Sequence, residues 1–145
     1  MSAVATGTSQ TLLLGEIVSS IATDFMESSH RDTAFPASYG TYRRLVNHLN
    51  NFYEQDLGKM TLEKELDRTY EYLCQVFRKY AGTTIVHYVH QLRVQRAKYL
   101  LLHSDQSVGE IAEKVGFRDA FYFSRVFKRL EGLSPQHYRD RAGTV

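Results

Sequence analysis

Residues 107–130 read SVGEIAEKVGFRDAFYFSRVFKRL, and this stretch carries the start and stop signals of two short helices. Ser107 and Glu110 form the S-x-x-E pattern of a capping box, which predicts that a helix starts here. Gly116 is suited to end that helix, and the side chain of Asp119 can cap the start of the next one. Two short helices separated by a tight turn predict a helix-turn-helix unit over about residues 107–130.

The second of these helices repeats a segment that lies fifty residues earlier in the chain. Four apolar positions and a closing glycine recur at the same spacing: Leu73, Val76, Phe77, Tyr80 and Gly82 return as Phe123, Val126, Phe127, Leu130 and Gly132. A basic pair follows the third apolar position in both copies. The repeat predicts a duplicated helical module, with a first helix-turn-helix at about residues 59–81 and a linker helix at about 84–103.

Helical patterns also extend outside the repeat. A helix is predicted from about Gly40 to Gly58, and Ser134 followed by Pro135 opens a short closing helix. The chain has only two prolines, and it has no alternating apolar-polar run long enough for a strand. The predicted fold is therefore all-α, with two helix-turn-helix subdomains joined by a long linker helix and preceded by an N-terminal helix.

The N-terminal part is expected to be separate from the duplicated modules. An apolar stripe at about residues 11–26 predicts the N-terminal helix, and residues 28–38 are polar and lack a helical period. We therefore divide the chain into an N-terminal helix with its linker, residues 1–39, and a second domain, residues 40–141.

Composition excludes several classes of protein and site. The single cysteine, Cys74, rules out an internal disulfide and a zinc site built from cysteines. His87 and His90 are three residues apart without an evident third ligand, so neither a metal nor another cofactor is expected. No signature of a catalytic cysteine is present, and we expect a protein that is not an enzyme. No apolar run is long enough for a membrane span, which favours a cytoplasmic protein.

Charge is distributed unevenly along the chain. Residues 1–60 hold four Lys and Arg against six Asp and Glu, whereas the remaining residues hold fourteen against ten. A surplus of basic residues in the duplicated part is compatible with a nucleic-acid partner, but a solvated surface would give the same surplus.

The two repeated helices are predicted to present polar outer faces. With the apolar positions turned inward at 100° per residue, the outward side chains are Phe121, Arg125 and Lys128 in the second copy, with Ser124 at the margin, and Glu71, Gln75 and Arg78 in the first, with Cys74 at the margin. Arginine can pair with guanine, glutamine with adenine and glutamate with cytosine. An ordinary pair of packed helices with a solvated face would show the same pattern, so both interpretations stay open on the pattern alone.

Several segments of the second half resemble the signature of AraC-type transcription regulators: 107–112, 115–119, 122–128 and 132–139. Upstream, four positions are similar to the central linker helix of that family: Arg93, Ala97, Leu100 and Leu101. The resemblance covers about residues 42–141. It implies that Ala112 allows the two helices to cross closely, that Phe117 fills the core beneath the turn and that Tyr138 docks the closing helix.

The first helix-turn-helix departs from the family pattern. Residues 61–67 contain neither alanine nor glycine, although such modules normally have a small residue in the first helix and a glycine in the turn. Either Glu63 occupies the place of the small residue or the turn is shortened.

The resemblance implies a sequence-specific transcription regulator that binds double-stranded DNA and inserts two recognition helices into successive major grooves. The expected base-contacting residues are Ala120, Phe121, Ser124 and Arg125 in the second module and Glu71, Cys74 and Gln75 in the first. The expected phosphate-contacting residues are Arg78, Lys79, Lys128, Arg129 and Ser107. The alternative is a protein-interaction or dimerisation module with a degenerate helix-turn-helix that no longer reads DNA.

The resemblance also bears on the partners and on the extent of the chain. RNA polymerase is an implied partner, and a dimer could form through an N-terminal domain that is missing from this sequence. We interpret the chain as a fragment of a longer regulator, with a small stand-alone member of the family as the alternative.

Overall fold

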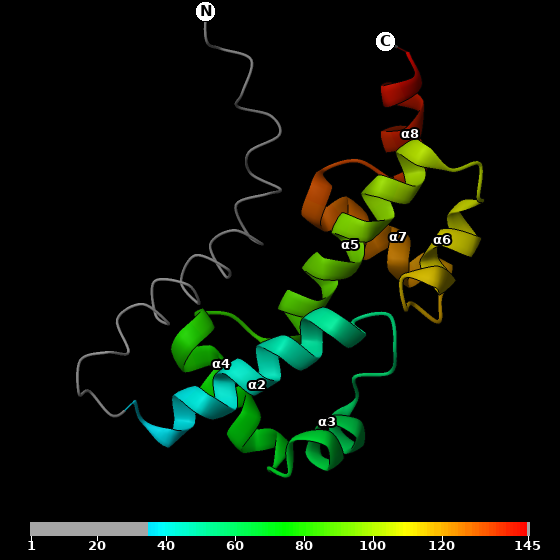
Figure 1. Cartoon of the computed structure of the whole chain (residues 1–145). Coiled ribbons are helices and arrows are strands. Elements are labelled where there is room, and N and C mark those ends of the chain that lie inside the picture. The colour runs from blue at the N-terminus through cyan, green and yellow to red at the C-terminus, as the bar shows by residue number, and fades with distance from the viewer. Residues whose placement is uncertain (1–34, 145) are drawn as a thin grey trace, which may run out of the picture. The chain divides into compact units, whose positions relative to one another are not determined.

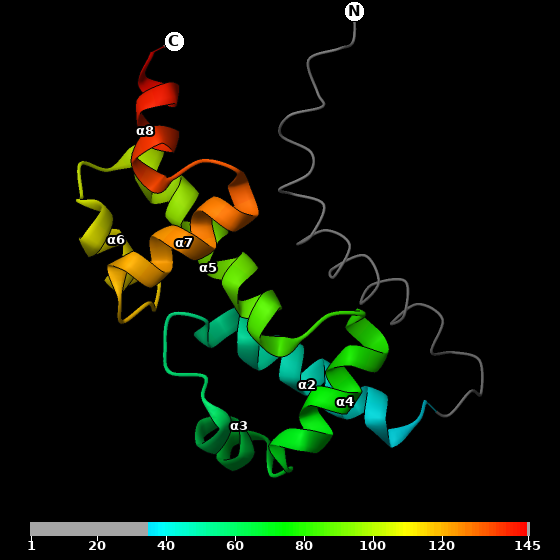
Figure 2. The same cartoon turned by 180° about the vertical axis from the view of Figure 1, so that it is seen from behind.

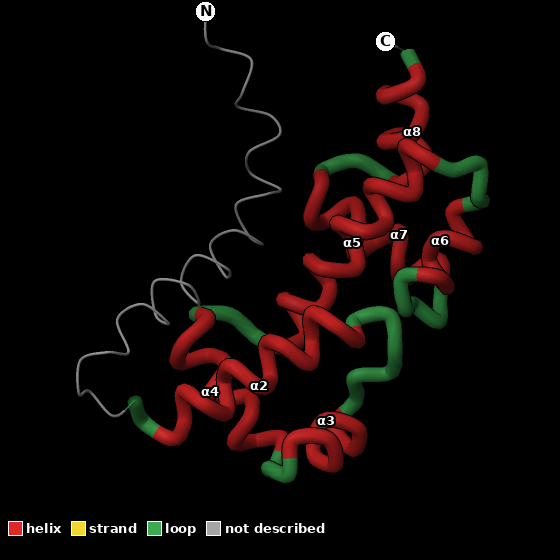
Figure 3. Tube along the Cα trace, in the orientation of Figure 1, coloured by secondary structure: helices red, strands yellow, loops and turns green. Residues whose placement is uncertain are grey.

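The structure is a computed structural model, and it describes residues 35–144. Each regular element of this range is a helix, as the sequence predicts (Figures 1 and 3). The helices are α2 (Ala37–Phe52), α3 (Lys59–Leu66), α4 (Tyr70–Ala81), α5 (Ile85–His103), α6 (Val108–Lys114), α7 (Ala120–Glu131) and α8 (Pro135–Gly143). The N-terminal helix predicted at about residues 11–26 lies outside the described residues, and so does most of the predicted linker.

The first module consists of α2, α3, α4 and the beginning of α5. Helix α2 packs mainly against α4, and α3 contacts both of them. The buried apolar side chains come from all four helices: Leu45, Val46 and Leu49 in α2, Leu62 and Leu66 in α3, Leu73, Val76 and Phe77 in α4, and Ile85 and Val89 in α5. Their spacing of three and four residues gives each helix one apolar face toward this core.

The second module consists of the end of α5 together with α6, α7 and α8 (Figure 2). Its core is one cluster of buried residues: Val94, Ala97, Leu100, Leu101, Ile111, Ala112, Val115, Phe117, Phe123, Val126 and Phe127. Ala112 is fully buried where α6 meets α7, and Phe117 lies beneath the turn, as the family pattern implies. Because α5 contributes side chains to both cores, it joins the two modules covalently and by packing.

The duplication extends to caps and aromatic contacts. Gly82 and Gly132 end α4 and α7 with positive φ angles of 70° and 80°. Tyr88 packs edge-on against Phe77 with ring centroids 5.3 Å apart, and Tyr138 packs in the same way against Phe127 at 5.5 Å. Thr84 and Ser134 provide the N-caps of α5 and α8. The helix after each helix-turn-helix is therefore docked by equivalent residues.

Two predicted helix limits are wrong. Helix α2 begins at Ala37 rather than Gly40, and it ends at Phe52 rather than at Gly58. Gly58 instead forms the N-cap of α3, because the chain leaves α2 at Tyr53 and runs as a loop to Gly58. The closing helix begins at Pro135, as predicted, and runs to Gly143. None of the described helices combines the length and apolarity needed to cross a membrane.

The turn of the first module resolves the choice left open by the sequence. One residue separates Asp67 from the N-cap of α4, whereas two residues separate Gly116 from the N-cap of α7. Asp67 has a positive φ of 51°, and Gly116, at the corresponding place in the second module, has a positive φ of 104°. Glu63 takes the place that corresponds to Ala112, and its carboxylate accepts a hydrogen bond of 2.8 Å from the backbone N–H of Tyr70. The turn is thus shortened, and Glu63 also replaces the small residue.

We expect Glu63→Ala to lower the free energy of unfolding by about 1–2 kcal/mol, because a partly buried N–H at the start of α4 loses its acceptor. Glu65→Ala, a truncation of an exposed glutamate in the same helix, is the control and should change stability by less than about 0.5 kcal/mol. Urea unfolding followed by circular dichroism measures both. Equal effects of the two substitutions would contradict the role given to Glu63.

Candidate nucleic-acid interface

Helices α4 and α7 are the second helices of the two helix-turn-helix units, and each presents an exposed polar face. The two faces have the same pattern of exposure at positions fifty residues apart, except that Tyr122 is more exposed than Tyr72. Glu71, Gln75, Arg78 and Lys79 are exposed on α4, and Phe121, Arg125, Lys128 and Arg129 are exposed on α7. Cys74 and Ser124 are half-buried at equivalent margins, as their positions on the helices predict.

The start of α7 is held by its N-cap. The carboxylate of Asp119 accepts hydrogen bonds from the backbone N–H groups of Phe121, at 2.7 Å, and Tyr122, at 3.1 Å. Next to this cap, Phe121 projects into solvent with 84% of its surface exposed, and Ala120 is half-buried. A large apolar side chain that is this exposed has no role in the core, and it is available to a partner.

Tyr122 is a residue of this face that the sequence analysis missed. Its ring lies 6.0 Å from that of Phe117, and the guanidinium carbon of Arg125 lies 5.9 Å from its centroid. The tyrosine therefore joins the exposed arginine to the packed residues beneath the turn. Its three-residue spacing from Arg125 was the signal in the sequence, because such residues are neighbours on a helix surface.

The outer face of α4 carries a mixed charge. The Glu71 carboxylate lies 3.0 Å from Nζ of Lys59, at the start of α3. A hydrogen bond from its own backbone N–H, and then the nearby Lys59 ammonium, hold the pKa of Glu71 below its ordinary value. Glu71 is therefore ionised at neutral pH and can accept hydrogen bonds but not donate them. Lys59 offsets part of the repulsion that this carboxylate would have toward phosphates.

The predicted residues form two groups rather than one site. The α4 group and the α7 group belong to different modules, on helices that α5 connects (Figure 2). Ser107 belongs to neither helix: it is the N-cap of α6, where its hydroxyl accepts a hydrogen bond from the backbone N–H of Glu110. Each group is available to a separate segment of an extended partner.

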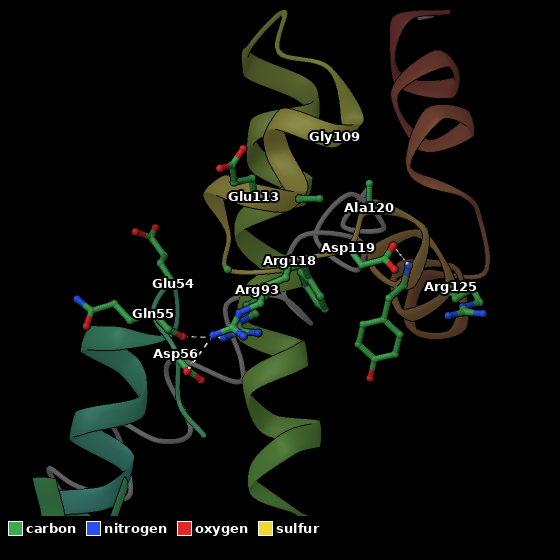
Figure 4. Close-up of a pocket in the computed structure, with 14 residues that line it drawn as sticks. Glu54, Gln55, Asp56, Arg93, Gly109, Glu113, Arg118, Asp119, Ala120 and Arg125 are labelled. Carbon is green, nitrogen blue, oxygen red and sulfur yellow. Dashed lines mark hydrogen bonds and ion pairs between the residues drawn. The ribbon is translucent and has the colours of Figure 1, made fainter. Parts of the chain in front are cut away.

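An open groove lies between the loop after α2 and the second module (Figure 4). Glu54, Gln55 and Asp56 line one side, and Ala120 and Arg125 are among the residues that line the other. Both acidic and basic side chains line it, so the groove has no single sign of charge.

His90 of α5 packs within the structure rather than facing solvent. The ring of His90 is buried and stacks on Phe117, with centroids 5.6 Å apart. Burial, together with the positive charges of Arg93 and Arg129, lowers the pKa of His90, so it is neutral at pH 7. Within residues 35–144, no group of three His, Cys, Asp or Glu side chains is arranged to hold a metal ion.

Comparison with known proteins identifies the arrangement. The family model described as a helix-turn-helix domain matches residues 62–141, which is more than half of the chain. The chain belongs to the AraC-type helix-turn-helix family. This family comprises DNA-binding transcription regulators rather than enzymes.

AraC-type relatives match the chain in sequence and in structure. The HTH-type transcriptional activator RhaR of Klebsiella pneumoniae is 49% identical over 70 residues, which are 48% of this chain and 25% of that protein. The C-terminal domain of AraT, a response regulator from Geobacillus stearothermophilus, matches with a TM-score of 0.67 and 30% identity over 70% of this chain and 84% of that domain. The DNA-binding domain of AdpA, solved in complex with a target DNA, gives a TM-score of 0.66 and 26% identity over 72% of this chain and 94% of that one. The chain spans about a quarter of the length of RhaR.

Proposed function

We propose that this chain is the DNA-binding part of a transcription regulator, and that α4 and α7 enter successive major grooves on one face of the DNA. The main support for this proposal is that α4 and α7 expose side chains at equivalent positions, fifty residues apart in the sequence. The two helices belong to the two modules that α5 connects. For both helices to enter the major groove on the same face of the DNA, the two points of entry must lie about 34 Å apart, which is one helical turn of DNA. The DNA-bound AdpA domain, which has the same fold, supports this arrangement.

The base contacts that we propose differ between the two modules. In α7, Arg125 would pair with a guanine, Phe121 would meet a thymine methyl group, and Ala120 and Ser124 would line the contact. In α4, the proposed contacts are Gln75 with adenine and Glu71 with cytosine, with Cys74 at the margin. Because the two sets of side chains differ, the preferred DNA site is asymmetric and one monomer fills it.

Phosphate contacts are proposed for the basic residues at the ends of the two helices and for one hydroxyl. These residues are Arg78, Lys79, Lys128, Arg129 and Ser107. They would fix the register of the protein on the duplex without reading sequence.

Binding should weaken steeply as the salt concentration rises, because each phosphate contact releases counterions. We expect Lys128→Ala to weaken binding to all sequences alike and to reduce the slope of log affinity against log salt by about 1. Arg44→Ala, which removes an exposed arginine from α2, is the control and should leave the slope unchanged. Fluorescence anisotropy at several salt concentrations measures both. Equal slopes for Lys128→Ala and the unchanged protein would contradict a phosphate contact at Lys128.

The partners of the whole protein belong to the same proposal. We infer that the chain acts within a longer cytoplasmic regulator, that further domains supply dimerisation, and that RNA polymerase is contacted at the promoter. The alternative is an interaction module whose helix-turn-helix units no longer read DNA. The irregular first module favours this alternative, whereas the exposed and capped recognition helix of the second module favours DNA binding.

Selection of binding sites from randomised DNA, at a stated salt concentration, tests the proposal. We expect an enriched asymmetric site with two conserved segments about one helical turn apart. Recovery of unenriched DNA at low salt would favour the interaction module instead.

A further inference from the structure

Arg93 lies at the point where the two modules meet. Its Nε donates a hydrogen bond of 2.7 Å to the carbonyl oxygen of Tyr53, and its Nη2 donates one of 2.9 Å to that of Gln55. These carbonyls belong to the loop that follows α2, where the ordinary helical partners are missing. The same guanidinium lies 5.4 Å from the centroid of Phe117, in the turn of the second module. One side chain of α5 thus contacts both modules.

The turn of the second module also contacts the loop directly. A Cβ atom added to Gly116 would lie 2.9 Å from the carbonyl oxygen of Glu54 and 2.9 Å from Nε of Arg93, so only glycine fits here. Arg118, the residue before the N-cap of α7, pairs with Asp56 at 3.0 Å (Figure 4). Both side chains of this pair are largely exposed, so the ion pair stabilises the contact between loop and turn less than the hydrogen bonds of the partly buried Arg93 do.

Arg139 of α8 provides a contrast within the same chain. Its Nη2 donates a hydrogen bond of 2.6 Å to the carbonyl oxygen of Gln106, and its Nε donates one of 3.1 Å to that of Leu101. Arg139 therefore holds the end of α5 and the loop after it by hydrogen bonds to backbone carbonyls, as Arg93 does for the loop after α2. All of its partners, however, lie in the second module. Hydrogen bonds from an arginine to backbone carbonyls therefore occur within the second module, at Arg139, and at the junction of the two modules, at Arg93.

We propose that Arg93, together with Gly116 and the Asp56–Arg118 pair, forms a latch that fixes the second recognition helix relative to the first. The inference rests on the proposed function and adds a residue that determines the spacing of the DNA site. Because Arg118 directly precedes Asp119, the N-cap of α7, a change at the latch shifts the start of this recognition helix. Opening the latch would let α4 and α7 adapt to sites whose two halves are set at other distances. Arg93 acts on DNA only through this geometry and is a positioning residue.

The test compares Arg93→Lys with Arg139→Lys on the selected site and on sites whose spacer is longer or shorter by about two base pairs. Lysine keeps the positive charge but cannot hydrogen-bond to both carbonyls as arginine does. Arg93→Lys makes this change at the junction of the modules, and Arg139→Lys makes it within the second module. We expect Arg93→Lys to reduce the preference for the selected spacing by about tenfold. Arg139→Lys should keep the preference of the unchanged protein. The same preference in all three proteins, or an equal loss in both variants, would overturn the latch.

Two further measurements keep the test decisive. Thermal melts establish that each variant is folded; if Arg93→Lys is not, Arg118→Ala replaces it, since that side chain is 85% exposed. This replacement should reduce the spacing preference by about twofold, and an unchanged preference would refute the latch. Failure of the unchanged protein to bind any spacing would instead refute the proposed DNA-binding function.

Discussion

Arg125→Ala is expected to weaken binding to the selected site about tenfold or more and to relax base preference in one half of it. Arg125 is exposed on α7, and its guanidinium lies against the ring of Tyr122, which packs on Phe117. A preorganised arginine that pairs with guanine through two hydrogen bonds contributes about 1–3 kcal/mol of discrimination. The fold should be unaffected, because Arg125 has no place in the core.

Gln75→Ala is the matched comparison, since Gln75 occupies the equivalent position on α4. It should have a smaller effect, confined to the other half of the site, because α4 begins after a shortened turn and carries the acidic Glu71. Affinities of both variants for a set of single-base changes in the site measure the two effects. Equal losses, or a larger loss for Gln75→Ala, would show that the second module is not the main reader of sequence.

Gly116→Ala is expected to lower the free energy of unfolding by about 3 kcal/mol or more. Gly116 has a φ of +104°, which costs any residue with a Cβ atom about 1–2 kcal/mol. In addition, the new methyl group would press on Nε of Arg93 and on the carbonyl oxygens of Tyr53 and Glu54, all within 3.0 Å. Backbone atoms cannot move away from such a contact without shifting the loop.

Gly132→Ala is the control that separates the cost of a positive φ from the cost of the steric contacts at Gly116. Gly132 has a φ of +80°, but a Cβ atom there would meet nothing within 4 Å. This substitution should therefore cost only the conformational part, about 1–2 kcal/mol. Urea unfolding of both variants gives the difference. Equal losses at the two glycines would contradict the close approach of the loop to the turn.

Local signals account for most of what the sequence predicts correctly. The capping box at Ser107, the N-cap at Asp119 and the closing glycines Gly82 and Gly132 act within a few residues, and the structure has each of them. The outward faces of α4 and α7 also follow from helical periodicity alone. The family resemblance then supplies the role of these faces, which periodicity cannot.

Contacts between distant residues account for what the sequence analysis missed. The helical pattern predicts that α2 ends at Gly58, but the loop after Phe52 is held by Arg93, forty residues away from Tyr53. The pairing of Glu63 with the N–H of Tyr70 depends on how α3 crosses α4. Asp67 adopts a positive φ without being a glycine, so the residue type alone did not reveal the turn.

Hydroxyl-radical footprinting of the selected site tests whether one chain places two different recognition helices in successive grooves. We expect two protected stretches on one face of the DNA, about ten base pairs apart, at a stoichiometry of one protein per site. Arg125→Ala should weaken protection of one stretch and leave the other. A single protected stretch, or a palindromic pair that only a dimer protects, would contradict this arrangement.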